Sequence, residues 1–255
     1  MIELLAPSGD EKSFITAINA GADAIYIGMG DFSARKNAQN FNVENIAYYV
    51  SYAHALGVKV YVAINTLVKD DEIENLLKTV APAYSAGVDA FILQDIFLAD
   101  LLKKNFPDIV LHLSTQAGVN EVGGALLAKE YGFSRVILAR ETALEEIKEI
   151  AKIIETEIFV HGALCTAFSG HCYMSAYVGG NSGNRGLCMR IVFHAFYQKL
   201  FDKVHFFNGC AKLGINLRGI GKQLLHIPAL LKHLLFFGYQ KVKSRNESRL
   251  DAVLR

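Results

Sequence analysis

The stretch "NAGADAIYIGM", residues 19–29, carries the pattern that decides the fold. A helical segment ends at Gly21, and a run of β-branched and apolar residues begins directly after it. The same pattern returns as "HALGVKVYVAI" at 54–64, "SAGVDAFILQD" at 85–95 and "EYGFSRVILAR" at 130–140. Glycine suits the end of a helix because the backbone there adopts a left-handed conformation. The apolar runs are continuous rather than alternating, which indicates strands that are covered on both faces.

Over the first 160 residues this pattern predicts strands that alternate with helices. The predicted strands lie near 2–6, 24–28, 59–65, 90–94, 109–114, 135–139 and 157–161. The predicted helices lie near 11–20, 43–56, 71–86, 96–105, 120–131 and 143–155. Such alternation is typical of βαβ units and a parallel sheet. Seven units without a reversal favour a (β/α)8 TIM-type barrel over an open doubly wound sheet, which is the alternative. No convincing eighth strand follows, and 234–242 is only a weak candidate.

The composition of the chain changes near residue 190. Acidic residues outnumber basic ones over 1–190, whereas basic residues dominate 191–255, although the whole chain has a net charge of only +1. We therefore expect a barrel with a cysteine-bearing loop at 1–190 and an atypical basic tail at 191–255. A divergent tail is favoured over a nucleic-acid-binding arm because its apolar and basic residues mix without a clear pattern.

The sequence indicates a cytoplasmic protein. The N-terminus lacks the basic and apolar segments of a signal peptide. The longest apolar stretch, "LLHIPALLKHLLFFGY" at 224–239, is interrupted by a proline, a lysine and two histidines, so no membrane span is expected. The sequence gives no indication of the oligomeric state.

A barrel places catalytic side chains just after the strand ends, on one face. Asn65, Gln116 and His161 follow predicted strands and are candidate polar positioning groups in catalysis. Arg140 also follows a strand, and together with Lys36 it is a candidate for binding the carboxylates of a small acid.

All four cysteines lie after residue 164. Cys165, Cys172 and Cys188 lie close to His161 and His171, and Cys210 is the fourth thiol. The spacing differs from that of a zinc knuckle. Thiolates suit iron–sulfur clusters and zinc, and Cys210, a histidine or an open iron position would complete a four-ligand site. The alternative is a Cys165 nucleophile with His161 or His171 as its base.

The stretch "EIFVHGALCTAFSGHCYMS", residues 157–175, resembles the signature of peptidase family U32, the collagenase-like peptidases. The matching residues are Glu157, Phe159, Gly162, Ala163, Leu164, Cys165, Gly170, Cys172 and Ser175. "ELLAPSGD", "AGADAIYIG", "DFSAR", "HLSTQ" and "GNRGLC" are similar to further landmarks of the family, so that the resemblance covers about residues 1–190.

The resemblance implies an oxygen-independent, iron–sulfur-dependent hydroxylase. Better understood relatives hydroxylate ribosomal RNA, transfer RNA or the ubiquinone ring, and hold a [4Fe–4S] cluster through four cysteines. Prephenate is implicated as the oxygen donor. Three cluster cysteines correspond to Cys165, Cys172 and Cys188. RNA, a small molecule and a peptide all stay open as substrates, and the alternatives are a cysteine- or metal-dependent peptidase and an inactive remnant or binding subunit.

The tail departs from the family pattern. The family continues after "GNRGxC" with a Gln-Pro-Cys-Arg block and a fourth cysteine before an Ile-Pro pair. Here "GLCMRIVFHAF" follows, and Lys222 or Gln223 stands where that cysteine is expected before "HIPALL". Residues 191–255 are therefore interpreted as divergent, truncated or read in a shifted frame, and as not completing the family's site.

Overall fold

The structure, a computed structural model, describes residues 2–34, 41–162, 165 and 167–188. All of these residues belong to one compact unit. The basic tail predicted at 191–255, the weak strand candidate at 234–242, Lys36 and Cys210 lie outside the described residues, and the expectations for them stay predictions.

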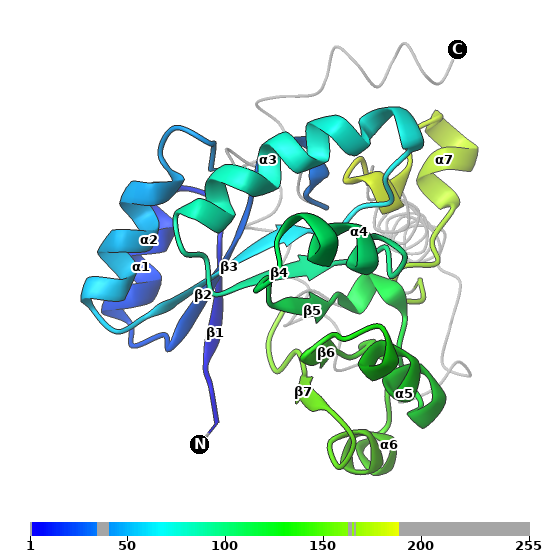
Figure 1. The fold of residues 1–255 in the computed structure, drawn as a ribbon. Coiled ribbons are helices and arrows are strands. Elements are labelled where there is room, and N and C mark those ends of the chain that lie inside the picture. Colours follow the sequence, from blue (N-terminus) through cyan, green and yellow to red (C-terminus); the bar gives the residue numbers. More distant parts are fainter. Residues whose placement is uncertain (1, 35–40, 163–164, 166, 189–255) are drawn as a thin grey trace, which may run out of the picture. The chain divides into compact units, whose positions relative to one another are not determined.

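Seven parallel strands form one curled sheet, whose order follows the sequence from β1 to β7 (Figure 1). The strands are β1 Leu5–Ser8, β2 Ala24–Gly28, β3 Lys59–Ile64, β4 Ala90–Leu93, β5 Leu111–Leu113, β6 Arg135–Ile137 and β7 Glu155–Glu157. The helices are α1 Glu11–Asn19, α2 Ile46–Ala55, α3 Ile73–Ser85, α4 Leu98–Asn105, α5 Val122–Glu130, α6 Leu144–Ile150 and α7 Met174–Gly179. Every strand pairs in parallel with the next strand along the chain. The α/β class and the parallel sheet are confirmed, and no eighth strand occurs among the described residues.

Glycine ends the helices as the repeated sequence pattern predicts. Gly21, Gly57, Gly87 and Gly132 have φ values of 88°, 72°, 81° and 75°. Each follows the capping residue of a helix and leads into the next strand. The seventh predicted strand, 157–161, is displaced: β7 ends at Glu157, and the residues after it form a loop. Helix α6 likewise ends at Ile150, five residues before the predicted end.

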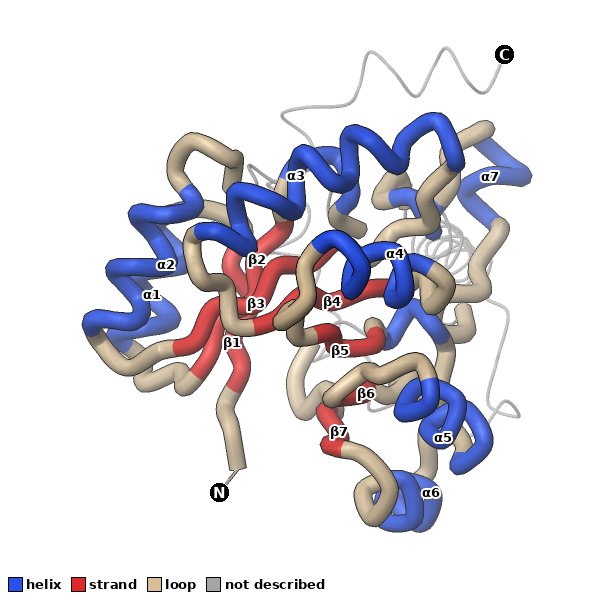
Figure 2. The backbone as a smooth tube through the Cα atoms, in the orientation of Figure 1, coloured by secondary structure: helices blue, strands red, loops and turns tan. Residues whose placement is uncertain are grey.

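The two faces of the sheet bury different sets of side chains. The outer face packs against the helices in a large apolar core, in which Phe14, Leu76 and Leu102 are fully buried. The inner face has a smaller apolar cluster, formed by Ala24, Tyr61, Ala63, Ala90, Ile92 and Ile137. Figure 2 shows the helices outside the curled sheet. Strands β2 to β6 are therefore covered on both faces, as their continuous apolar sequences predict, whereas β1 and β7 are partly exposed.

A charged layer joins the first and last strands on the inner face. The Arg135 guanidinium on β6 donates to Glu3, just before β1, at 2.7 Å, and to Glu155 and Glu157 on β7 at 2.6 and 3.3 Å. Glu3 also accepts hydrogen bonds from Lys59 and from the Tyr61 hydroxyl, both at 2.8 Å. These contacts connect the two ends of the sheet through side chains.

Candidate functional site

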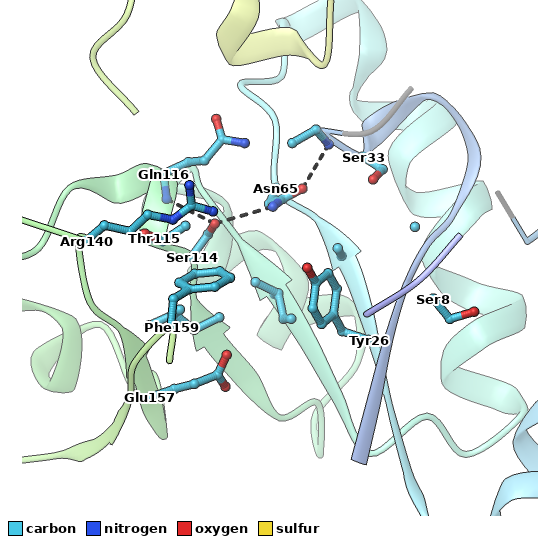
Figure 3. Close-up of a pocket in the computed structure, with 15 residues that line it drawn as sticks. Ser8, Tyr26, Ser33, Asn65, Ser114, Thr115, Gln116, Arg140, Glu157 and Phe159 are labelled. Carbon is cyan, nitrogen blue, oxygen red and sulfur yellow. Dashed lines mark hydrogen bonds between the residues drawn. The ribbon is translucent and has the colours of Figure 1, made fainter. Parts of the chain in front are cut away.

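A pocket of about 130 Å³ opens at the carboxyl-terminal ends of the strands (Figure 3). Side chains from within the strands line its deeper part: Tyr26, Ala63, Ile92, Ile137 and Glu157. Residues at and after the strand ends line its mouth, including Ser8, Ser33, Asn65, Ser114, Thr115, Gln116, Arg140 and Phe159. Every strand except β5 contributes a lining residue, and β5 contributes through the loop that follows it, so that the cavity has a polar mouth and a mostly apolar interior.

Hydrogen bonds hold Asn65 at the mouth of this pocket. Its Oδ1 accepts from the Ala34 backbone N–H at 2.9 Å, and its Nδ2 donates to the Ser114 hydroxyl at 3.4 Å. The Ser114 hydroxyl is buried and also accepts from the Gln116 backbone N–H at 3.2 Å. Asn65 therefore links the loop after β2 to the loop after β5, which fixes the position of its own amide.

Arg140 and Phe159 form the opposite side of the mouth. The Arg140 guanidinium lies 4.5 Å from the centre of the Phe159 ring, within the range of a cation–π interaction. Both side chains are exposed and line the pocket. The structure thus brings together three predicted site residues, Asn65, Gln116 and Arg140, and puts a cation and an aromatic ring at the entrance.

The charged groups below the pocket differ in their ionisation. Burial raises the pKa of Glu3, but hydrogen bonds from Arg135, Lys59 and Tyr61 outweigh burial and lower it to about 2. Burial raises the pKa of Glu157 to about 7, although Arg135 acts in the opposite direction. Burial lowers the pKa of His112 to about 3, and the nearby Arg135 charge adds to this effect. Near neutral pH, Glu3 is therefore ionised, His112 is neutral, and Glu157 is partly protonated.

The cysteine-bearing segment is attached to the rim of the sheet at two places. Ser169 donates its backbone N–H and its hydroxyl to the Glu141 carboxylate, at 3.1 and 2.9 Å. Arg185 forms a two-bond ion pair with Glu72, one bond of 2.9 Å, and donates to the Leu67 carbonyl at 2.8 Å. Residues 169–185 are therefore held across the loops that follow β3 and β6.

The three cysteines do not form a completed metal site in the described part of the chain. Cys165 is exposed, and its Sγ accepts from the Ala167 N–H at 3.5 Å. Cys188 is also exposed, and its Sγ accepts from the Ser175 hydroxyl at 3.9 Å. No group of three or more histidine, cysteine, aspartate or glutamate side chains is placed to hold a metal ion among the described residues. Thiols suit an iron–sulfur cluster chemically, but the described arrangement by itself does not provide its ligand set.

The predicted histidines lie away from the pocket lining. His161 is exposed, and Nδ1 of His171 lies 2.8 Å from the carbonyl oxygen of Ser169. Neither histidine forms a hydrogen bond with Cys165 in the described residues, so the structure contains no formed thiol–imidazole pair there. The roles predicted for these residues, and for Lys36, stay predictions.

Two residues of the site, Glu157 and Arg135, were not assigned a role from the sequence. Glu157 was noted only as part of the family signature, and Arg135 was placed inside an apolar strand. Each is a charged residue within a predicted strand. An ionised side chain inside a sheet needs a partner of opposite charge, so this pattern could have indicated an ion pair.

Comparison with known proteins gives the family. The sequence pattern of peptidase family U32 matches residues 9–204. The chain belongs to peptidase family U32. An Escherichia coli 23S rRNA 5-hydroxycytidine synthase is 42% identical over 189 residues, which are 73% of this chain and 28% of that protein. The Escherichia coli tRNA hydroxylation protein P is 40% identical over 73% of this chain and 42% of its own length.

Other U32 relatives have different names. A Porphyromonas gingivalis protein named collagenase is 32% identical over 74% of this chain and 48% of its own length. The chain thus spans less than half the length of these relatives. A solved U32 peptidase structure superposes with a TM-score of 0.52 and 17% identity, over 62% of this chain and 67% of the other, which supports the fold alone. No helix in the described residues has the length and hydropathy required to traverse a bilayer.

Proposed function

We propose that this U32 protein hydroxylates RNA. The observation that carries the proposal is an identity of about 40% with proteins named for tRNA and rRNA hydroxylation, over 73% of this chain. The family match, residues 9–204, includes strands β2 to β7, which line the pocket together with the loops after them. An RNA substrate would place the protein in the cytoplasm, and a nucleic acid base would be the part that reaches the cavity.

The side chains at the mouth have roles consistent with this reaction. Arg140 provides a positive charge for a phosphate or a carboxylate, and Lys36 is proposed as a second cation. Asn65 and Gln116 present amide groups that can orient a substrate. His161 is proposed as a further positioning group. An eighth strand would close the curled sheet into a full (β/α)8 barrel around them.

The cysteines are proposed as ligands of a [4Fe–4S] cluster, which would supply one-electron redox chemistry. Cys165, Cys172 and Cys188 would provide three ligands, and the fourth would come from outside the described residues. Prephenate is the proposed oxygen donor. Anaerobic preparation followed by iron and sulfide analysis tests this part, and we expect about four irons per chain. A colourless, iron-free protein would contradict it.

The hydroxylation proposal is tested in an Escherichia coli strain that lacks both its tRNA hydroxylation protein and its 23S rRNA 5-hydroxycytidine synthase. The protein is expressed there, and hydroxylated pyrimidines are quantified by mass spectrometry of purified RNA. We expect hydroxylated nucleosides to return, and Arg140→Ala to lower their yield at least tenfold. Lys78→Ala is the matched control, because Lys78 is an exposed cation that pairs with Glu74 on its own helix and with no other carboxylate among the described residues. Unmodified RNA in cells that contain folded protein would refute the proposal.

A peptidase is the second candidate, because one U32 relative is named a collagenase. Cleavage of denatured collagen or casein that is lost in Cys165→Ser would favour it. A protein with neither activity and without iron would instead be the inactive remnant or binding subunit.

A further inference from the structure

Glu157 occupies an unusual position in the pocket. It is the last residue of β7 and lies in register with Ile137 of β6, so that both side chains enter the inner face at the same level. Only 17% of its side chain is exposed. Figure 3 shows Glu157 on the same side of the cavity as Phe159, which lies two residues further along the chain toward the mouth. The pocket therefore contains a carboxyl group at depth.

Glu157 has weaker ionic contacts with Arg135 than Glu3 and Glu155 have. Arg135 binds Glu3 and Glu155 at 2.7 and 2.6 Å, but it lies 3.3 Å from Glu157. Glu3 has two further donors, whereas Glu155 is 62% exposed to solvent. Glu157 is thus a mostly buried carboxyl with one long ionic contact, and its burial raises its pKa to about 7. A carboxyl in this condition is available as a neutral acid, which both donates and accepts a hydrogen bond.

The rest of the pocket suits a flat, polar ring. Two aromatic side chains line it, Tyr26 and Phe159, and the Arg140 guanidinium lies over the Phe159 ring. The interior is small and otherwise apolar, while the amides and the Arg140 guanidinium are at the mouth. Enzymes that modify bases bring the base out of its stack into such a pocket, where aromatic side chains stack on the ring and polar groups read its edge.

We propose that Glu157 is a substrate-contacting residue whose neutral carboxyl reads the hydrogen-bonding edge of a pyrimidine ring bound in this pocket. With a uracil ring, the carbonyl oxygen of Glu157 accepts from N3–H and its hydroxyl donates to O4. With a cytosine ring, the hydroxyl donates to N3 and the carbonyl oxygen accepts from the N4 amino group. Both pairings use two hydrogen bonds, and both lose the donated bond when the carboxyl ionises. The inference rests on the proposed function, because it assigns the part of the RNA that enters the pocket.

The proposal implies a specific pH dependence of binding. The charged and titratable groups that face Glu157 are Arg135, Glu3 and Glu155, and Tyr26 and Arg140 line the same cavity. Arg135 stays cationic, because its hydrogen bonds with carboxylates outweigh the effect of burial on its pKa, and Glu3 stays ionised. Among Arg135, Glu3 and Glu157, it is therefore Glu157 that changes charge between pH 6 and pH 8.5. Affinity for a pyrimidine should fall as Glu157 ionises, by at most about tenfold per pH unit, since the carboxylate still accepts one of the two hydrogen bonds.

The test measures binding of uridine, cytidine and adenosine to the whole protein by ligand-observed NMR between pH 6 and pH 8.5. We expect both pyrimidine nucleosides to bind more tightly than adenosine, with the affinity falling at high pH. Glu157→Gln keeps a donor and an acceptor without a titratable group, so it should bind pyrimidines with no pH dependence. Glu157→Leu should weaken pyrimidine binding at least tenfold. Glu155→Gln is the matched control, since Glu155 also contacts Arg135 but does not line the pocket. It should keep pyrimidine binding and its pH dependence, with the fall in affinity beginning at a somewhat lower pH, because the Glu155 charge helps to raise the pKa of Glu157.

Several results would overturn the inference. These are the absence of pyrimidine binding, an unchanged pH dependence in Glu157→Gln, and wild-type binding by a Glu157→Leu protein that circular dichroism shows to be folded. RNA hydroxylation measured in parallel separates the two proposals. If RNA is hydroxylated but pyrimidine binding does not change in the Glu157 variants, the inference is wrong and the proposed function stands. Binding that follows Glu157 without any hydroxylated RNA would remove the proposed function alone.

Discussion

His112 shows how strongly single residues on the inner face depend on their surroundings. Its ring is 4% exposed, makes an edge contact with Tyr61 at 4.9 Å between ring centres, and has an Nδ1 atom without a hydrogen-bond partner in the described structure. The neutral ring fits this environment, whereas its protonated form would lie beside the Arg135 cation. The structure therefore stabilises His112 as an uncharged aromatic residue.

We predict that His112→Phe reduces the acid sensitivity of the fold. The folded state depresses the pKa of His112 from 6.5 to about 3, so its contribution to stability is present above pH 6.5 and lost as the pH falls toward 3. Each pH unit in this range lowers the free energy of unfolding by about 1.4 kcal/mol for this one site. Urea denaturation at several pH values should show a smaller decline in the variant. His161→Phe, at an exposed position, should decline like the wild type.

At the scale of elements, the cysteine-bearing segment depends on a close contact between backbones. Gly170 has a φ of +75°, and a Cβ atom added to it would lie 1.8 Å from the Gln116 carbonyl oxygen. The Ser169–Glu141 and Arg185–Glu72 contacts hold the segment on either side of the cysteine at 172. A side chain at 170 would therefore push the segment away from the loop after β5, which lines the pocket.

We predict that Gly170→Ala destabilises the protein more than Gly180→Ala does. Both glycines have positive φ angles, of +75° and +67°, but a Cβ atom at Gly180 would meet nothing within 4 Å. Gly180→Ala should lower the free energy of unfolding by about 1–2 kcal/mol, from backbone strain alone. Gly170→Ala adds a steric clash and should lower it by about 1–3 kcal/mol more. Equal losses in urea denaturation would show that the segment does not rest on the Gln116 loop.

How much the sequence predicts differs between the elements. Strand β2 has its predicted limits, since Gly21 and Gly28 bracket a short apolar run. Strand β7 begins two residues earlier than predicted. Its two glutamates, Glu155 and Glu157, can lie in the sheet because Arg135 of the neighbouring strand neutralises their charge. The sequence around the two glutamates does not indicate this contact. Helix α7 was not predicted, because six residues with a mostly exposed surface carry no apolar periodicity.

The candidate site was predictable to the extent that parallel strand ends converge. Asn65, Gln116 and Arg140 share one pocket because each follows a strand of the same sheet. The charged layer below the pocket was not predictable in this way. Glu3 and Arg135 are 132 residues apart in sequence, and nothing in either local stretch indicates the other.

At the scale of the whole molecule, Glu3 connects the first strand of the sheet to β3 and β6. It accepts hydrogen bonds from Arg135, Lys59 and Tyr61, and 20% of its side chain is exposed. Within the described residues β1 and β7 share no backbone ladder. The carboxylate of Glu3 thus stabilises the curvature of the sheet through side chains.

We predict that Glu3→Gln lowers the free energy of unfolding by about 3 kcal/mol at neutral pH, because it leaves the buried Arg135 charge with weaker partners. The pKa of Glu3 is lowered from 4.5 to about 2 in the folded state, so its stabilising effect exists above pH 4.5 and disappears as the pH falls toward 2. The difference between the variant and the wild type should therefore shrink over that range. Lys59→Gln, which removes a half-exposed partner, should cost at most about 1 kcal/mol.

The strictly sequential order of the strands bears on how the protein forms during synthesis. Each strand pairs with the one made just before it, so the sheet can grow from its first edge while the ribosome is still translating. The Glu3 carboxylate can contact Lys59 and Tyr61 early in synthesis, but it can contact Arg135 only after a further stretch of chain is made, since Arg135 lies 132 residues after Glu3. At ordinary translation speeds this delay is on the order of ten seconds. A nascent chain stalled before Arg135 should therefore hold paired strands whose curvature is not yet fixed.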